Sequence, residues 1–294
     1  MAASSTRSTS PPTERRRPII VRPSVIPGFG VTFGFSFACL GLVVLLPLLA
    51  LFLKAAEISP ARSLAILTDP RTIAALRVSF GSSIIAALVN IVFGLIVAWV
   101  LVRYRFPGRR ILDAIVDLPF ALPTAVAGVA LSSLYAQNGW VGSVVGHLGL
   151  KVAYTPAGIV VALIFVGLPF VVRTVQPVLE ELDKEQEEVA ATLGARRGQT
   201  LRRVILPRLT PAILAGFALA FARAVGEYGS VIFIAGNIPF VSEIAPLLIV
   251  IRLQEFNVPA ASLVAAVMLV LSLAMLLVIN LLQLWSRRRF GDGV

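Results

Sequence analysis

Long apolar runs alternate with short polar segments along most of this chain. Each run has about 20 residues or more, which is the length of a helix that crosses the hydrocarbon core of a bilayer. Because a backbone inside lipid must satisfy its own hydrogen bonds, the runs predict helices. Six membrane-spanning helices are predicted, over residues 31–53, 79–102, 111–135, 156–175, 211–236 and 259–285.

Proline residues mark the expected starts of several helices. Thr155 and Thr210 each precede a proline, so each is expected to be the N-cap of its span. Asp69 also precedes a proline, and this pair predicts a short surface helix in front of the second span. Pro119 and Pro123 lie near the start of the third span, so its first turns are expected to be kinked or broken.

The composition predicts a polytopic all-α membrane protein. Apolar residues make up 57% of the 294 residues and charged residues only 14%, with a mean hydropathy of +0.91, which exceeds what one soluble core can bury. We expect a disordered cytoplasmic tail over 1–27, a six-helix transmembrane domain over 28–286 with a polar loop at 176–210, and a cytoplasmic C-terminal tail over 287–294. Cys39 and His147 are the single residues of their types, so no metal site, cofactor or catalytic residue is expected.

The basic residues predict the orientation in the membrane. Of the 26 Lys and Arg, 18 lie in the N-terminal tail, the 103–110 turn, the 176–210 loop and the C-terminal segment, whereas six lie in the other three loops. Cytoplasmic loops carry the excess of Lys and Arg, so both termini and the polar loop are predicted to be cytoplasmic. Since these charges lie between apolar spans, the net charge of +11 is assigned to orientation and no nucleic-acid partner is expected.

The polar loop predicts a helix, a glycine cap and a second helix. Acidic residues gather in the first half of a helix-forming stretch at 179–193, and Gly194 follows it as the expected C-cap. The small side chains of Ala190 and Ala191 offer a face for close approach by another protein. Thr200 is expected to open a second short helix that Pro207 ends. The composition is consistent both with a solvated connection between two spans and with a docking site for a soluble partner.

Three residues within the spans are candidates for a translocation path. Arg223 and Glu227 are four residues apart in the fifth predicted span and are expected to share one helix face. They form either a structural ion pair or a guide for an anion, in which Glu227 prevents Arg223 from binding too tightly. Thr124 is the third candidate. Arg173 is expected to extend to the membrane interface.

The loop resembles the EAA loop of ABC importer permeases. Glu188, Val189, Ala190, Gly194, Val204, Leu206 and Pro207 match its spacing, with Val189 where alanine is usual and Val204 where isoleucine is usual. In that family the loop docks on a separate ATPase subunit. The resemblance assigns this contact to Glu188, Val189, Ala190, Gly194, Ala195, Leu206 and Pro207.

Further segments resemble the sulfate/thiosulfate permease subunits of these importers, of the T or U type. They are residues 103–109, 117–124, 169–177 and 226–229; the molybdate permease shares the last segment and differs in the second. The resemblance implies a type I (MetI-like) fold in a bacterial inner membrane. It also implies an ATPase dimer, a homologous second permease and an external sulfate/thiosulfate-binding protein as partners, with ATP closing the ATPase dimer and rocking the spans.

Two other function classes fit the residues less well. An ion-driven secondary transporter needs titratable groups in several spans, and only Arg223 and Glu227 qualify. A membrane enzyme lacks a recognisable motif, since the sequence contains neither HExxH nor GxSxG. The sequence also contains no GxxxxGK[ST] motif, so ATP hydrolysis is expected to belong to a separate chain.

Overall fold

The computed structural model describes residues 29–182 and 184–290, and within them all regular elements are helical. The chain divides into two units, residues 1–49 and 50–294, and each is described by itself. The predicted N-terminal tail and the last four residues lie outside the described residues. The helices are α1 (Phe29–Leu40), η1 (Gly41–Leu45), α2 (Leu46–Ala56), α3 (Pro60–Thr68), α4 (Pro70–Arg103), α5 (Arg109–Val116), α6 (Leu118–Ala121), α7 (Thr124–Tyr135), α8 (Trp140–His147), α9 (Pro156–Glu181), α10 (Lys184–Thr192), α11 (Arg197–Thr200), η2 (Leu201–Ile205), α12 (Leu206–Val225), α13 (Val231–Ile234), α14 (Ala245–Gln254) and α15 (Val258–Phe290).

Five helical stretches are long and apolar enough to cross a membrane. Within the described residues they are Gly30–Ala56, Pro70–Arg103, Pro156–Glu181, Arg197–Val225 and Val258–Leu284. The predicted third span is instead divided into α5, α6 and α7, because prolines at 119 and 123 interrupt the helical hydrogen-bond ladder. The expected break is therefore confirmed, and the count of six full-length spans is not.

The first unit is an apolar helix whose described side chains are largely exposed. It changes from α to π geometry over Gly41–Leu45, and Pro47 follows two residues later. A proline ring clashes with the carbonyl four residues earlier, and a wider turn moves that carbonyl away. The helix continues through the proline for this reason.

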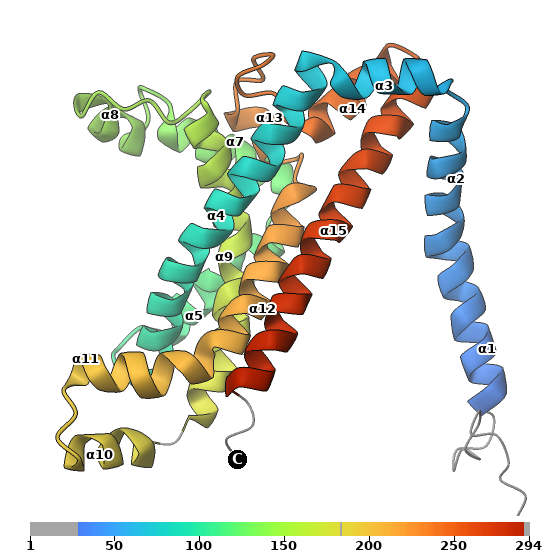
Figure 1. Cartoon of the computed structure of the whole chain (residues 1–294). Coiled ribbons are helices and arrows are strands. Elements are labelled where there is room, and N and C mark those ends of the chain that lie inside the picture. The colour runs from blue at the N-terminus through green and yellow to red at the C-terminus, as the bar shows by residue number, and fades with distance from the viewer. Residues whose placement is uncertain (1–28, 183, 291–294) are drawn as a thin grey trace, which may run out of the picture. The chain divides into compact units, whose positions relative to one another are not determined.

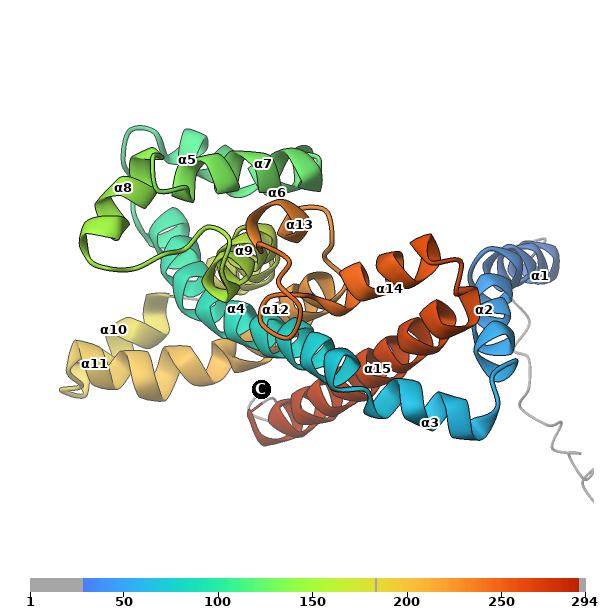
Figure 2. The same cartoon turned by 90° about the horizontal axis from the view of Figure 1, so that it is seen from above.

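The second unit is built around α4, α9, α12 and α15 (Figure 1). Helix α9 packs on α4 and α12, while α15 packs on α12 and α14 (Figure 2). Three helices meet closely at Val171 of α9. A Cβ added to Gly94 of α4 would lie 2.7 Å from its Cγ1, and one added to Gly216 of α12 would lie 3.0 Å from its Cα. Small residues allow this close contact, as is usual between membrane helices.

Helix starts in the second unit agree with the proline signals at two of three positions. Asp69 caps α4 and accepts a 3.4 Å hydrogen bond from the Arg71 N–H, but α4 then runs unbroken to Arg103 rather than forming a separate surface helix. Helix α9 begins after Thr155 as predicted and continues to Glu181. Thr210 is not a cap. It lies inside α12 and its hydroxyl donates to the Leu206 carbonyl.

Two other segments contain helix that the sequence did not predict. Helix α15 continues to Phe290, so the predicted C-terminal tail at 287–294 begins inside a helix. The connection between the third and fourth predicted spans contains the short helix α8. At the opposite end of the second unit, α10 and α11 project beyond the bundle (Figure 1).

Candidate functional site

Helix α10 is closed by the glycine cap that the sequence predicts. Gly194 has φ +81°, and its N–H donates to the Ala191 carbonyl at 2.9 Å. The next N–H, of Ala195, donates to the Ala190 carbonyl at 3.0 Å. These two bonds form a Schellman motif, which satisfies carbonyls that a helix end would otherwise leave unpaired. The loop is therefore a defined helical projection.

The exposed face of α10 differs from the predicted one. The stretch expected as one helix over 179–193 is two, because α9 extends to Glu181 and α10 starts at Lys184. Ala190 is buried and Ala191 is exposed, so only Ala191 of the predicted small-residue face is accessible. The exposed residues also include Glu188, Val189 and Leu193, with Leu193 83% exposed. Leu193 was not among the predicted site residues, although its spacing of four from Val189 places both on one helix face.

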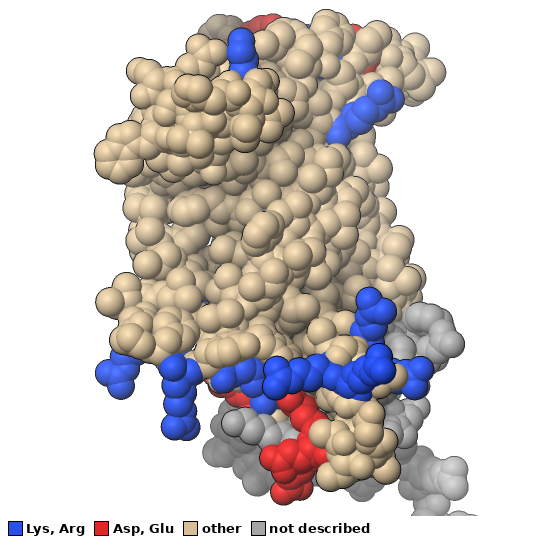
Figure 3. All heavy atoms as spheres, turned by 90° about the vertical axis from the view of Figure 1, so that its left-hand side faces the viewer, with Lys and Arg blue, Asp and Glu red and all other residues tan. Residues whose placement is uncertain are grey.

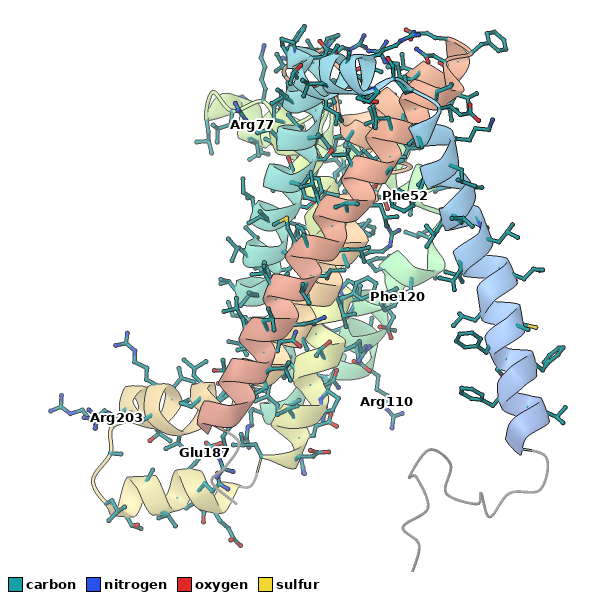
Figure 4. All side chains as sticks on the ribbon, turned by 45° about the vertical axis from the view of Figure 1, so that its right-hand side comes forward. Phe52, Arg77, Arg110, Phe120, Glu187 and Arg203 are labelled. Carbon is teal, nitrogen blue, oxygen red and sulfur yellow. The ribbon has the colours of Figure 1, made fainter. Side chains whose placement is uncertain are left out.

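Helix α10 is tied to α4 by an ion pair. Arg103 Nη2 donates to Glu187 Oε1 at 2.6 Å, and both side chains are at least two-thirds buried. The Arg103 guanidinium also lies 5.6 Å from the centre of the Trp99 ring, within cation–π range. Figure 4 shows Glu187 between α10 and the segment formed by α11 and η2.

The segment after Gly194 leads directly into a membrane-length helix. The Gln199 side chain accepts a 2.8 Å hydrogen bond from the Arg196 N–H, and α11, η2 and α12 then continue without a break from Arg197 to Val225. The predictions that Thr200 opens a short helix and that Pro207 ends it are wrong. As in the first unit, a π turn ends two residues before the proline and allows the helix to pass it.

The Arg223–Glu227 pair forms, but not on one helix. Helix α12 ends at Val225, so Glu227 lies in the turn beyond it. Its buried carboxylate accepts from Arg223 Nη1 through one oxygen and from the Ser230 N–H (2.9 Å) and hydroxyl (3.0 Å) through the other. Arg223 retains 35% side-chain exposure, so this side chain is only partly buried.

Thr124 lies beside the same turn. A Cβ added to Gly229 would be 2.2 Å from the Thr124 hydroxyl oxygen, and one added to Gly128 would be 2.4 Å from the Ser230 carbonyl. The structure thus brings the start of α7 against residues 229–230. The three predicted path residues belong to one region, although Thr124 is more than 90 residues from the others in sequence.

Arg173 is held by side chains of α5, the start of α6 and its own helix. It makes two bonds to the Asp117 carboxylate (2.8 and 2.6 Å), one to the Asp113 carboxylate (2.7 Å) and one to Gln176 (2.8 Å). These contacts fix α5 and the start of α6 on α9. Phe120 adds an edge-to-face contact with Phe170 at 5.1 Å, and Figure 4 shows Phe120 on α6.

A further ion pair, between Arg71 at the start of α4 and Glu243 just before α14, was missed from sequence. Arg71 Nε and Nη2 donate to the two oxygens of Glu243 at 2.8 and 2.7 Å, and Glu243 is buried. Nearby, the Ser79 hydroxyl accepts from the Ala245 N–H at 2.8 Å. The partners are more than 160 residues apart, so no local sequence signal pairs them.

Residues 90–292 match the family described as "Binding-protein-dependent transport system inner membrane component". A protein from Salmonella typhimurium, named as sulfate transport system permease protein CysT, is 52% identical over 92% of this chain and 96% of its own length. The protein of the same name from Synechocystis is 52% identical over 85% of this chain and 88% of its own length.

Solved structures are similar in fold. A bacterial ABC transporter that imports alginate has a TM-score of 0.72 at 16% identity, covering 88% of this chain and 94% of that chain. The MetNI methionine ABC transporter has a TM-score of 0.54 at 19% identity, covering 79% of this chain and 99% of that chain. The predicted all-α, MetI-like importer fold is confirmed.

Proposed function

The chain belongs to the family of binding-protein-dependent transport system inner membrane components, and we propose that it is the permease subunit of an ATP-driven importer of sulfate and thiosulfate. The main support for sulfate as the substrate is the 52% identity, over 92% of the chain, to a sulfate transport permease. The fold shared with ABC importers and the capped projection at α10 support the coupling to ATP.

A separate ATPase dimer is the proposed partner of α10. Its contact surface centres on Glu188, Val189 and Leu193, which are exposed. Gly194 and Ala195 set the angle of this helix through the Schellman cap. Leu206 and Pro207 belong to the helix that carries motion onward rather than to the docking surface.

The continuous helix from Arg197 to Val225 is the proposed lever. It begins beside α10 and ends two residues before Glu227, so a displacement of α10 is transmitted to the region of Arg223 and Thr124. Because Glu227 binds one side of the Arg223 guanidinium, the exposed side can attract a sulfate dianion without holding it as a bare cation would.

The family supports the remaining partners, and the charge distribution supports the orientation. We assign an external sulfate/thiosulfate-binding protein, consistent with a similar alginate transporter in complex with its periplasmic protein, and a homologous second permease. The polar loop and both termini are proposed to be cytoplasmic. In support, a belt of Lys and Arg crosses the end that bears α10 and α11 (Figure 3), where positive charge is expected on the cytoplasmic side.

Reconstituted transport tests the proposal. The complex is purified from membranes, identified by its subunits, and placed in proteoliposomes with the binding protein. Sulfate should stimulate ATP hydrolysis, and labelled sulfate should accumulate only when ATP is present. Uptake that persists without an ATPase and collapses with the ion gradient would instead indicate a secondary transporter.

A molybdate permease is the second candidate within the same class. It shares the 226–229 segment with this chain, so the transport assay is repeated with labelled molybdate. Sulfate and thiosulfate should compete for uptake, while molybdate at the same concentration should not. Preferential molybdate uptake would reassign the substrate and leave the coupling proposal intact.

A further inference from the structure

An apolar groove of about 850 Å³ lies between the last turns of α4, helix α10 and the α11–η2 segment. Its volume is within the range of about 300–1,000 Å³ that is usual for small-molecule sites. The main apolar side chains that line it are Leu95, Ile96, Trp99, Val100, Leu201 and Ile205.

The groove is open toward the lipid-facing side of α4. Ile96 is 53% exposed and Leu201 is 39% exposed, although both line it. Phe93 and Val92, one turn earlier on α4, are also exposed, so the groove continues an apolar surface of a membrane-length helix. A lipid chain that covers this surface can enter the groove without leaving the bilayer.

The charges at the groove favour an anion. Arg197 lines it and has no ion-pair partner among the described residues. The one carboxylate in the lining belongs to Glu187, and Arg103 neutralises it at a distance of 2.6 Å. The site therefore combines an apolar wall with an uncompensated positive charge.

The groove lies at the depth of lipid headgroups. Trp99 and Tyr104 line it at the end of α4, and these two residue types concentrate where the hydrocarbon core meets the polar layer. The belt of Lys and Arg in Figure 3 marks the same end of the molecule. An anionic lipid held here would place its chain toward Ile96 and its phosphate toward Arg197.

We propose that this groove binds an anionic phospholipid, with one acyl chain against α4 and η2 and the phosphate on Arg197. The ATPase is not the proposed occupant because its docking surface is the outward face of α10, at Val189 and Leu193. The bound lipid would brace the start of the α11–α12 lever against α4. This site depends on membrane insertion and does not depend on which anion is transported.

Quenching of Trp99 fluorescence tests the proposal. The full chain carrying Trp140→Phe and Trp285→Phe retains Trp99 as its only tryptophan. It is placed in phosphatidylcholine bilayers containing a minor fraction of either brominated phosphatidylglycerol or brominated phosphatidylcholine. Brominated phosphatidylglycerol should quench Trp99 at a mole fraction about fivefold lower, the factor expected for one basic residue at a membrane surface.

Two variants of the same helix separate a site from general surface charge. Arg197→Gln should abolish the preference for phosphatidylglycerol. Arg203→Gln should keep it, because residue 203 does not line the groove and is two positions past Leu201, on the other side of the helix. Circular dichroism checks that both variants keep their helical content.

Three outcomes would overturn the proposal. The first is equal quenching by the two brominated lipids, and the second is an equal loss of preference in both variants. The third is loss of quenching when the ATPase subunit is added, which would assign the groove to that protein. Excess inorganic phosphate should leave the quenching unchanged, since the acyl chain supplies most of the contact.

Discussion

At the scale of single residues, Gly194 owes its role to backbone geometry alone. Its φ of +81° lies in the left-handed region, and an added Cβ would meet nothing within 4 Å. Gly198 is an equally open glycine four residues later, inside α11 and without a left-handed φ. The same substitution at the two positions therefore differs only in backbone strain.

We predict that Gly194→Ala uncouples transport while Gly198→Ala does not. An L-residue in the left-handed conformation costs about 1–2 kcal/mol, which weakens the cap and releases α10 from its fixed angle. Sulfate-stimulated ATP hydrolysis should fall severalfold in the first variant, with normal amounts of chain in the membrane. Full stimulation in Gly194→Ala would show that α10 does not need this cap to couple.

Single and double variants can distinguish a structural role of the Arg223–Glu227 pair from a role in transport. Glu227→Gln leaves Arg223 without a counter-charge and should lower the free energy of unfolding by about 2–3 kcal/mol. Adding Arg223→Gln should restore part of that loss, because no unpaired charge remains. Thermal unfolding in detergent measures both changes.

Uptake then reveals the second role. If Arg223 attracts the anion, the double variant regains stability while sulfate uptake remains at least tenfold below that of the unmodified chain. Normal uptake by the stable double variant would restrict this pair to holding the turn after α12, and would remove Arg223 from the proposed path.

At the scale of elements, the close contact between α7 and residues 229–230 is possible because glycine, which has no side chain, occupies positions 128 and 229. A Cβ at Gly128 would lie 2.4 Å from the Ser230 carbonyl oxygen, which is backbone and cannot rotate away. Gly81 of α4 offers a matched comparison, because a Cβ there would meet nothing within 4 Å. Both glycines are helical.

We predict that Gly128→Ala separates α7 from this turn and that Gly81→Ala is harmless. Forcing one methyl group into a closely packed contact costs about 1–3 kcal/mol, whereas alanine in an open helical position is neutral or stabilising. The melting temperature and sulfate uptake should fall together in the first variant only. A Gly128→Ala protein with normal melting and uptake would contradict the close contact.

Proline residues in this chain do not always end a helix. Pro207 suggests a helix end, yet the π turn at Leu201–Ile205 allows the helix to continue from α11 into α12. Proline residues 119 and 123 have the opposite outcome, since the chain there breaks into three short helices. The Arg173 contacts with Asp113 and Asp117 hold the first two of these helices, α5 and α6, on α9.

At the scale of the whole molecule, the proposed orientation can be tested by chemical labelling. Cys39 is the single cysteine, so Cys39→Ser gives a background without thiols. Gln199→Cys and Val144→Cys place single thiols at exposed positions on α11 and α8, at opposite ends of the second unit (Figure 1).

We predict that a membrane-impermeant maleimide labels Cys-substituted Val144 in intact cells and Cys-substituted Gln199 only in inverted vesicles. The positive-inside distribution of Lys and Arg is the physical reason. Labelling with the reverse sidedness would invert the proposed topology, and with it the assignment of α10 to the ATPase.

The sequence by itself determined the features that depend on local chemistry. Apolar run length established the membrane class, because backbone hydrogen bonds cannot be left open in lipid. Proline after Asp69 and after Thr155 set two helix starts, because proline restricts its own φ. Gly194 set the end of α10, because glycine adopts the left-handed conformation of a helix cap without strain.

The tertiary structure decided everything that requires distant partners. Arg173 finds its carboxylates 56 and 60 residues away, and Arg71 finds Glu243 at a separation of 172. Neither pairing can be read from spacing, because the packing of α5 on α9 and of α14 on α4 brings the groups together. The groove at Trp99 arises in the same way, from three helices whose positions only the folded chain defines.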